Sequence, residues 1–244
     1  ATFGNAAELI IAIMGLRAAA RVIADPAKVA TYINVVKASI TGSIIGNLLL
    51  ILGLAFVAGG LKRPVLRFNR TSTGMSAGML FLSVVSLVLP ALYHVVHRAD
   101  ADLRLDERTI AIESELLVHA IGEVTSTLGL NAMFLGLIVI PIIGNAAEHA
   151  AAVVFARKGQ MDLSLQIALG SSTQVALLVA PVLVFVGVAM GVPMDLVFTP
   201  FEVLVLALAT VTAAVLTLDG ESHWFEGVQL LALYVMVGIA AFFI

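Results

Sequence analysis

Two copies of one short polar motif stand inside strongly apolar stretches of this 244-residue chain. The pentapeptide Gly-Asn-Ala-Ala-Glu occupies residues 4–8 and recurs at residues 144–148. An ionisable side chain in the middle of a bilayer costs at least ~2.5–3.5 kcal/mol, so two matched copies need a reason to persist. We interpret them as the two halves of one ion site. The alternative for either glutamate alone is a side chain that extends to the membrane interface.

Oxygen donors accompany both motifs. Each motif is followed by an apolar segment with a Gly-Ser pair, at residues 42–43 and 170–171, and then by an amide, Asn47 or Gln174. Carboxylate, carboxamide, hydroxyl and backbone carbonyl oxygens together suit Ca²⁺, which takes about 6–8 oxygen ligands in flexible geometry. Two glutamates would neutralise one divalent cation.

The same arrangement predicts competition between metal and protons. Two carboxylates that face each other in an apolar site repel each other and are poorly solvated, so the empty site favours their protonated forms. Metal entry would then displace protons, which is the minimum that a cation/proton antiporter requires. His149, which follows the second motif, either tunes or carries protons or is a structural histidine. Gly4, Gly144 and Pro141 are predicted to break helices and to free backbone carbonyls, which membranes tolerate where they line a cavity.

Composition places the chain in a membrane. Apolar residues make up 61% of it and charged residues 12%, against ~25% charged in an ordinary soluble domain. The formal net charge of −3 offers no basic surface for nucleic acid, and the absence of cysteine excludes thiolate metal sites.

The apolar stretches predict an all-α, multi-pass membrane protein, because the alternation of a membrane barrel is absent. Residues 21–37 are expected to form a polar connector in which Asp25-Pro26 acts as a breaker. The predicted spans are residues 4–20, 38–61, 71–96, 131–156, 163–191, 195–218 and 227–244.

Residues 115–128 differ from their neighbours. Glu115, His119, Gly122 and Ser126 recur at helical spacing on one face, so the segment is amphipathic. Such a helix either lies at the bilayer surface or lines a hydrated vestibule.

These motifs resemble those of the calcium/proton exchangers of the cation/Ca²⁺ antiporter superfamily. The residues that carry the resemblance are 2–9, 141–149, 158–163, Gly170-Ser171-Ser172 with Gln174, and Asp219-Gly220 with Trp224. The histidine after the second motif is similar to the proton-coupled branch. By this resemblance Glu115 and His119 belong to a gating helix that lines the vestibule. The resemblance implies a central acidic pair with polar residues around the ion path, namely Glu8, Glu148, Asn5, Asn145, Ser43, Ser171 and Gln174.

Internal repeats in transporters often run in opposite senses across the membrane. If the spans before the second motif each cross once, the two motif helices would run parallel, whereas inverted repeats need them antiparallel. Family members also carry helices ahead of the first motif and a further segment between the halves. We therefore expect repeats at residues 1–97 and 112–244, joined by a segment 98–111 from which residues are omitted. With that crossing restored, the basic residues within 62–70 and at 157–158 share one side, which the positive-inside rule makes cytoplasmic.

The resulting hypothesis is a transporter, not an enzyme, that exchanges Ca²⁺ (with other divalent cations as further candidates) for protons by alternating access. Its partners are Ca²⁺, H⁺ and the lipid of a prokaryotic cell membrane or a eukaryotic vacuolar-type membrane, with no cofactor and no nucleic acid. The alternatives are a sodium/calcium or other cation exchanger of the same superfamily, a cation channel with the glutamates as a selectivity ring, and a non-transporting membrane scaffold.

Overall fold

The computed structural model describes residues 5–97 and 131–244. Apart from two short strands and the turns and loops that connect the elements, these residues are helical, and three segments labelled η are π-helical. In chain order the elements are α1 (Ala6–Arg21), α2 (Pro26–Ile45), η1 (Gly46–Ile51), α3 (Leu52–Gly60), β1 (Leu66–Arg67), α4 (Arg70–His97), α6 (Ala132–Phe134), η2 (Leu135–Val139), α7 (Ile140–Gly144), α8 (Ala146–Arg157), α9 (Met161–Gln174), η3 (Val175–Val179), α10 (Ala180–Ala189), α11 (Pro200–Leu216), β2 (Glu221–Ser222) and α12 (Trp224–Phe243).

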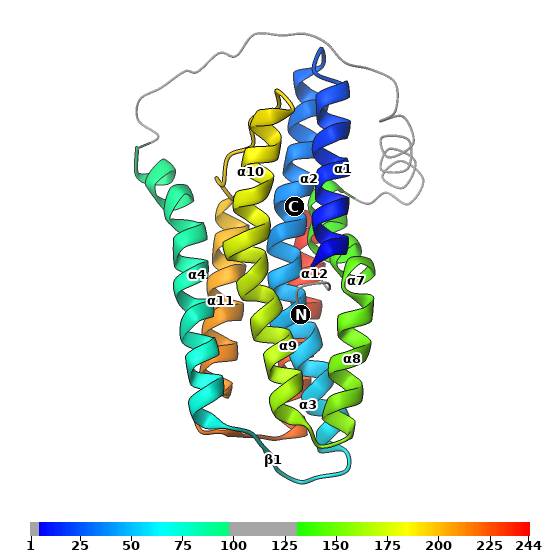
Figure 1. Cartoon of the computed structure of the whole chain (residues 1–244), viewed down its shortest axis with the longest axis vertical. Helices are drawn as coiled ribbons and strands as arrows, with labels where there is room; N and C mark the ends of the chain where they lie inside the picture. Colours follow the sequence, from blue (N-terminus) through cyan, green and yellow to red (C-terminus); the bar gives the residue numbers. More distant parts are fainter. Residues whose placement is uncertain (1–4, 98–130) are drawn as a thin grey trace.

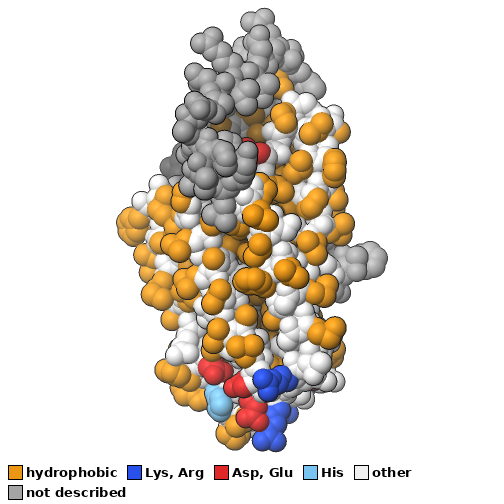
Figure 2. Space-filling view, turned by 90° about the vertical axis from the view of Figure 1, so that its left-hand side faces the viewer, with side chains coloured by type: hydrophobic (Ala, Val, Ile, Leu, Met, Phe, Trp, Pro, Cys, Tyr) orange, Lys and Arg blue, Asp and Glu red, His pale blue; other side chains and the backbone are white. Residues whose placement is uncertain are grey.

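The helices are long and apolar enough to cross a bilayer several times, which confirms the predicted α-helical multi-pass class. Four continuous helical runs qualify, namely Pro26–Gly60, Arg70–Ala91, Met161–Ala189 and Trp224–Phe243. A fifth span is broken: Ala132–Gly144 and Ala146–Arg157 meet at a 60° bend. Figure 2 shows the face of the molecule that carries α4. Hydrophobic side chains cover most of the length of this face, and charged side chains gather at the lower end of the molecule. The run Pro26–Gly60 is the central helix, since 83% of its most apolar window is buried inside the protein.

The polar connector predicted at residues 21–37 is wrong over most of its length. Only residues 22–25 connect α1 to α2, because α2 begins at Pro26. The side chain of Asp25 accepts a hydrogen bond from the backbone N–H of Lys28 at 3.2 Å, and proline occupies the first helical position. Both features favour a helix start. The Asp-Pro pair therefore begins a helix here instead of ending one.

The helix predicted at residues 195–218 begins later than expected. Residues 192–199 are not helical, and the side chain of Thr199 caps α11, which begins at Pro200. Asp195 instead reaches across to α2, where its Oδ1 lies 2.8 Å from the Lys37 Nζ. This ion pair explains how α2 keeps a lysine that is almost fully buried.

One short pair of strands also joins segments that are distant in the sequence. Leu66 pairs with Ser222 and Arg67 with Glu221, in antiparallel register. No strand was predicted from the sequence, because two residues show no alternation that could be recognised.

The elements run in opposite directions in the two halves of the chain. In Figure 1, α1 rises from near the middle of the molecule toward one end, whereas α8 descends from near the middle toward the other. The central run α2–α3 descends, and α9–α10 rises. This arrangement is consistent with inverted repeats. We call the end that holds residues 61–69, 158–160 and 217–223 the strand end, and the end that holds residues 22–25 and 190–199 the opposite end.

The strand end gathers the basic segments that the orientation argument placed on one side. The side chain of Arg63 contacts the carbonyl of Arg157 at 3.5 Å, and the backbone N–H of Asn69 donates to Asp162 at 2.7 Å. The loop after α3 therefore packs against the turn between α8 and α9.

Gly42 allows helices to approach each other closely near the motifs. A Cβ added at Gly42 would clash with the carbonyl oxygen of Leu137 and with the Pro141 ring. Here α2 crosses η2 and α7 with backbone against backbone. Proline has no backbone N–H and cannot donate the hydrogen bond of a regular helix. The π-helical segment η2 ends at Val139, two residues before Pro141, so the helix widens where that hydrogen bond is missing.

Candidate ion-binding site

The two sequence motifs meet near the middle of the molecule. Glu8 lies in the first turn of α1 and Glu148 in the first turn of α8, and each is 8% exposed. A Cβ added at Gly144 would lie 3.7 Å from the Cγ of Glu8. The glycine of the second motif thus stands against the carboxylate side chain of the first. The bend of the broken span lies at Asn145, directly after this glycine.

Ser43 of α2 joins the two motifs on one side of the site. Its hydroxyl donates to Glu8 Oε1 at 2.8 Å and accepts from the Asn145 Nδ2 at 3.1 Å. All three side chains are buried. The serine therefore links the glutamate of the first motif to the asparagine of the second.

Ser171 of α9 makes the mirrored connection. Its Oγ lies 2.7 Å from Glu148 Oε2 and 2.7 Å from Asn5 Oδ1. The Nδ2 of Asn5 donates to Gln174 Oε1 at 2.9 Å. Each serine thus joins the glutamate of its own half to the asparagine of the other half. All seven predicted metal-binding residues lie in two hydrogen-bonded groups that interlock.

Several oxygens at this centre have no hydrogen-bond donor. Glu8 Oε2 and Asn145 Oδ1 are buried, and no group in residues 5–97 or 131–244 donates a hydrogen bond to either. Both atoms are acceptors only, and buried acceptors without a donor call for an explanation. A cation would supply the missing interaction. Within residues 5–97 and 131–244 no group of three or more His, Asp or Glu side chains is placed for a metal, so amide and hydroxyl oxygens would have to complete a Ca²⁺ shell.

Asn47 was not among the predicted ligands, although the structure singles it out. It lies in η1 and is fully buried, and neither its Oδ1 nor its Nδ2 has a hydrogen-bond partner within the part of the chain that the structure describes. It follows Ser43 by four residues, which places both side chains near the same helix face. That spacing was the signal available in the sequence.

The other predicted residues differ in what the structure says of them. His149 Nε2 is buried without a hydrogen-bond partner. Pro141 is buried in α7 against Gly42. Gly4, Glu115 and His119 lie outside the described residues.

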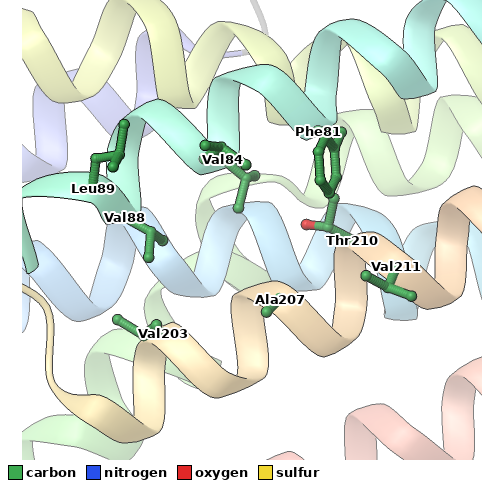
Figure 3. Close-up of a pocket in the computed structure, with 9 residues that line it drawn as sticks. Phe81, Val84, Val88, Leu89, Val203, Ala207, Thr210 and Val211 are labelled. Carbon is green, nitrogen blue, oxygen red and sulfur yellow. The ribbon is translucent and has the colours of Figure 1, made fainter. Parts of the chain in front are cut away.

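A separate apolar cavity lies between α4 and α11 (Figure 3) and has a volume of about 330 Å³. Its lining includes Phe81, Val88 and Leu89 of α4 with Val203, Thr210 and Val211 of α11. It contains none of the predicted ion-site residues, and Thr210 is its single polar lining residue. It therefore offers no ligands for a cation.

A bundle of membrane-length helices with two buried glutamates, at the starts of two oppositely directed helices, defines a polytopic membrane protein with an oxygen-rich centre. The description "Sodium/calcium exchanger protein" belongs to the family whose profile matches residues 1–103 and 109–243. The chain belongs to this family, which confirms the predicted superfamily resemblance.

Relatives match over the whole chain. The "Ca(2+)/H(+) antiporter" of Aphanothece halophytica is 36% identical in an alignment that covers 100% of this chain and 80% of that protein. The "Vacuolar calcium ion transporter" of Schizosaccharomyces pombe is 31% identical over 100% of this chain and 70% of its own length. Among solved structures, native YfkE is similar with a TM-score of 0.83 and 34% identity, covering 100% of this chain and 82% of that one.

Proposed function

We propose that this chain is a proton-coupled antiporter that moves Ca²⁺ across a membrane in exchange for protons. The observation that carries the proposal is the interlocked pair of glutamates, in which Ser43 and Ser171 each connect the two halves. The names of the Aphanothece halophytica and Schizosaccharomyces pombe relatives support calcium as cargo, and the first name supports protons as the counter-ion.

Ca²⁺ would bind between Glu8 and Glu148. Their two charges neutralise the ion, and oxygens of Asn5, Asn145, Ser43, Ser171 and Gln174 complete the shell. Asn47 joins this set as a further candidate, because its amide oxygen is buried next to Ser43 without a donor.

Protons would replace the metal at the same carboxylates. The hydroxyl of Ser171 has one proton, but two acceptor oxygens lie 2.7 Å from it. A proton on Glu148 would allow both contacts to be hydrogen bonds at once. Glu8 Oε2, which has no donor, offers a second place for a proton. His149 remains a candidate for carrying protons to or from this centre.

Alternating access would arise from the opposite orientation of the two halves. We propose that residues 1–97 and 112–244 are the repeats, that Glu115 and His119 line a vestibule, and that the strand end faces the cytoplasm. A motion that exposes the glutamates to one side and then to the other would exchange the two kinds of ion without an open pore.

Sodium is the second candidate for the counter-ion, because the family description names sodium/calcium exchange. The charge of the site fits both counter-ions, since either two protons or two sodium ions balance two carboxylates.

The test is Ca²⁺ uptake into sodium-free proteoliposomes with and without an imposed pH gradient. We expect uptake to require the gradient and to fall by roughly tenfold or more in Glu8→Gln and Glu148→Gln, since ~1.4 kcal/mol of lost binding already gives tenfold. Glu226→Gln, at the start of α12 and away from the motifs, is the matched control. Uptake that ignores the pH gradient but follows a sodium gradient would favour the second candidate.

A further inference from the structure

A third buried carboxylate, Glu202 in the first turn of α11, has no role in the exchange described above. It is 2% exposed. Its Oε2 accepts hydrogen bonds from the backbone N–H and the hydroxyl of Thr199, both at 2.8 Å, in a capping box. Its Oε1 faces α2, where the hydroxyl of Thr41 lies 3.4 Å away. The capping box therefore accounts for one carboxylate oxygen and leaves the other directed at the helix that carries Ser43.

A line of charged groups connects Glu202 to the surface. Lys37 lies one turn before Thr41 on α2, and its Nζ is 2.8 Å from Asp195 Oδ1. The side chain of Lys37 is 11% exposed, whereas that of Asp195 is 62% exposed. The Thr41 hydroxyl lies 3.3 Å from the backbone carbonyl oxygen of Lys37 and 3.4 Å from Glu202 Oε1, so it stands between the two residues. Charge therefore extends from the surface at the opposite end of the molecule to an acid buried in the bundle.

This line is separate from the metal pair. Thr41 and Ser43 are two positions apart on a helix, so their side chains point in different directions. Among the described residues, the hydrogen bonds of Glu202 go to Thr199 and Thr41, and none joins it to either motif. The charged groups that face Glu202 from the described residues packed on α11 are Lys37 of α2 and, through it, Asp195. The α4 residues that line the cavity beside α11 are all apolar. The sequence of η1, Gly46–Ile51, contains no charged residue.

We propose that Glu202 is a second proton-binding residue, which exchanges one proton with the water at the Asp195 surface and thereby controls how firmly α11 holds α2. This inference rests on the proposed function. When Glu202 is ionised, it accepts from Thr41 and attracts Lys37. When one proton from water binds to the carboxylate, the group is neutral, the attraction to Lys37 is lost, and the hold on α2 weakens. Ser43 moves with α2, so the proton at Glu202 acts on the ion site without contact with the metal.

Glu202→Gln tests this directly, because the amide oxygen can still accept from the Thr199 N–H but the side chain no longer binds a proton near neutral pH. Two exchange reactions are measured in proteoliposomes: Ca²⁺/H⁺ exchange as a function of pH on the Asp195 side, and Ca²⁺/Ca²⁺ exchange with labelled calcium, which moves no net protons. We expect Glu202→Gln to lose one titration step from this pH profile, while the step due to the exchanged protons at Glu8 and Glu148 remains and Ca²⁺/Ca²⁺ exchange is kept. Thr41→Val, which removes the hydroxyl but keeps the size, should change the pH profile in the same direction.

Glu226→Gln is the control, since it neutralises the carboxylate of the second capping box, at the start of α12 on the strand end. Its pH profile should equal that of the unmodified protein. An unchanged pH profile in Glu202→Gln, or a parallel fall of both exchange reactions at an unchanged unfolding temperature, would overturn the proposal. If the unmodified protein itself shows no exchange driven by pH, the proposed antiport fails and this inference falls with it.

Discussion

Replacing Ser171 by alanine tests whether its hydroxyl is a Ca²⁺ ligand or only stabilises the site without metal. The change removes the one group that contacts both Glu148 and Asn5, each at 2.7 Å. A buried hydrogen bond to a charged group contributes about 1.5–3 kcal/mol. If the serine oxygen also binds the metal, losing it should weaken Ca²⁺ binding by a similar amount, which is roughly 10- to 150-fold.

The neighbouring Ser172 provides the matched control. It is equally buried, but its hydroxyl donates to the carbonyl of Ala168 one turn earlier in the same helix, at 2.9 Å. Ser172→Ala therefore removes a buried hydroxyl without touching either glutamate. Calorimetric titration of purified protein with Ca²⁺ gives the two affinities, and thermal unfolding shows whether the variants are equally folded.

The sign of the effect distinguishes two roles for Ser171. If the hydroxyl only stabilises the metal-free carboxylate, its loss would destabilise the empty site and make Ca²⁺ bind more tightly. Tighter binding by Ser171→Ala, or equal affinities in the two alanine variants, would refute its assignment as a ligand.

Three further perturbations follow from the packing and the hydrogen bonds. Gly42→Ala should destabilise the protein by about 1–3 kcal/mol through its clash with Leu137, whereas Gly170→Ala meets nothing within 4 Å and should not, as thermal unfolding would show. Asn47→Leu should leave the unfolding temperature unchanged or raised, since it removes a buried amide without partners, but should reduce Ca²⁺ uptake; normal uptake would remove Asn47 from the ligand set. Hydrogen bonds from the side chain of Lys28 and then from its backbone N–H hold the pKa of Asp25 below its ordinary value of 3.8, so these contacts stabilise the start of α2 fully above about pH 4 and their contribution is lost as pH falls through the lowered pKa. Asp25→Ala should therefore lower the unfolding temperature at neutral pH and have less effect in acid, and an equal effect at both would contradict the assignment.

The repeated motif carried most of what could be predicted about the site. Identical pentapeptides in a chain with few polar residues are a strong local signal, and the oxygen chemistry follows from the residue types. The interlocking of the two halves could not be predicted, because it depends on which helices cross. Ser43 reaches Asn145 over 102 residues, and no local pattern encodes that contact.

The two errors in the predicted elements have different origins. The polar residues of 21–37 suggested a connector, but Lys37 is neutralised by Asp195, 158 residues away in the sequence. Once that charge is paired, α2 can continue as a helix from Pro26 into the core. Residues 195–199 stay outside α11 because Thr199 caps this helix and Pro200 occupies its first position. Long-range charge pairing thus overrode local hydropathy in α2, whereas local capping decided where α11 begins.

Proton release on metal binding tests the central claim most directly. Purified protein in weakly buffered, sodium-free solution is titrated with Ca²⁺ while the pH is recorded. We expect Ca²⁺ to release protons from the unmodified protein and from Glu226→Gln, and Glu8→Gln and Glu148→Gln each to bind Ca²⁺ weakly and release fewer protons. Tight Ca²⁺ binding without proton release, or equal release from all four proteins, would contradict a site in which these two glutamates hold either the metal or protons.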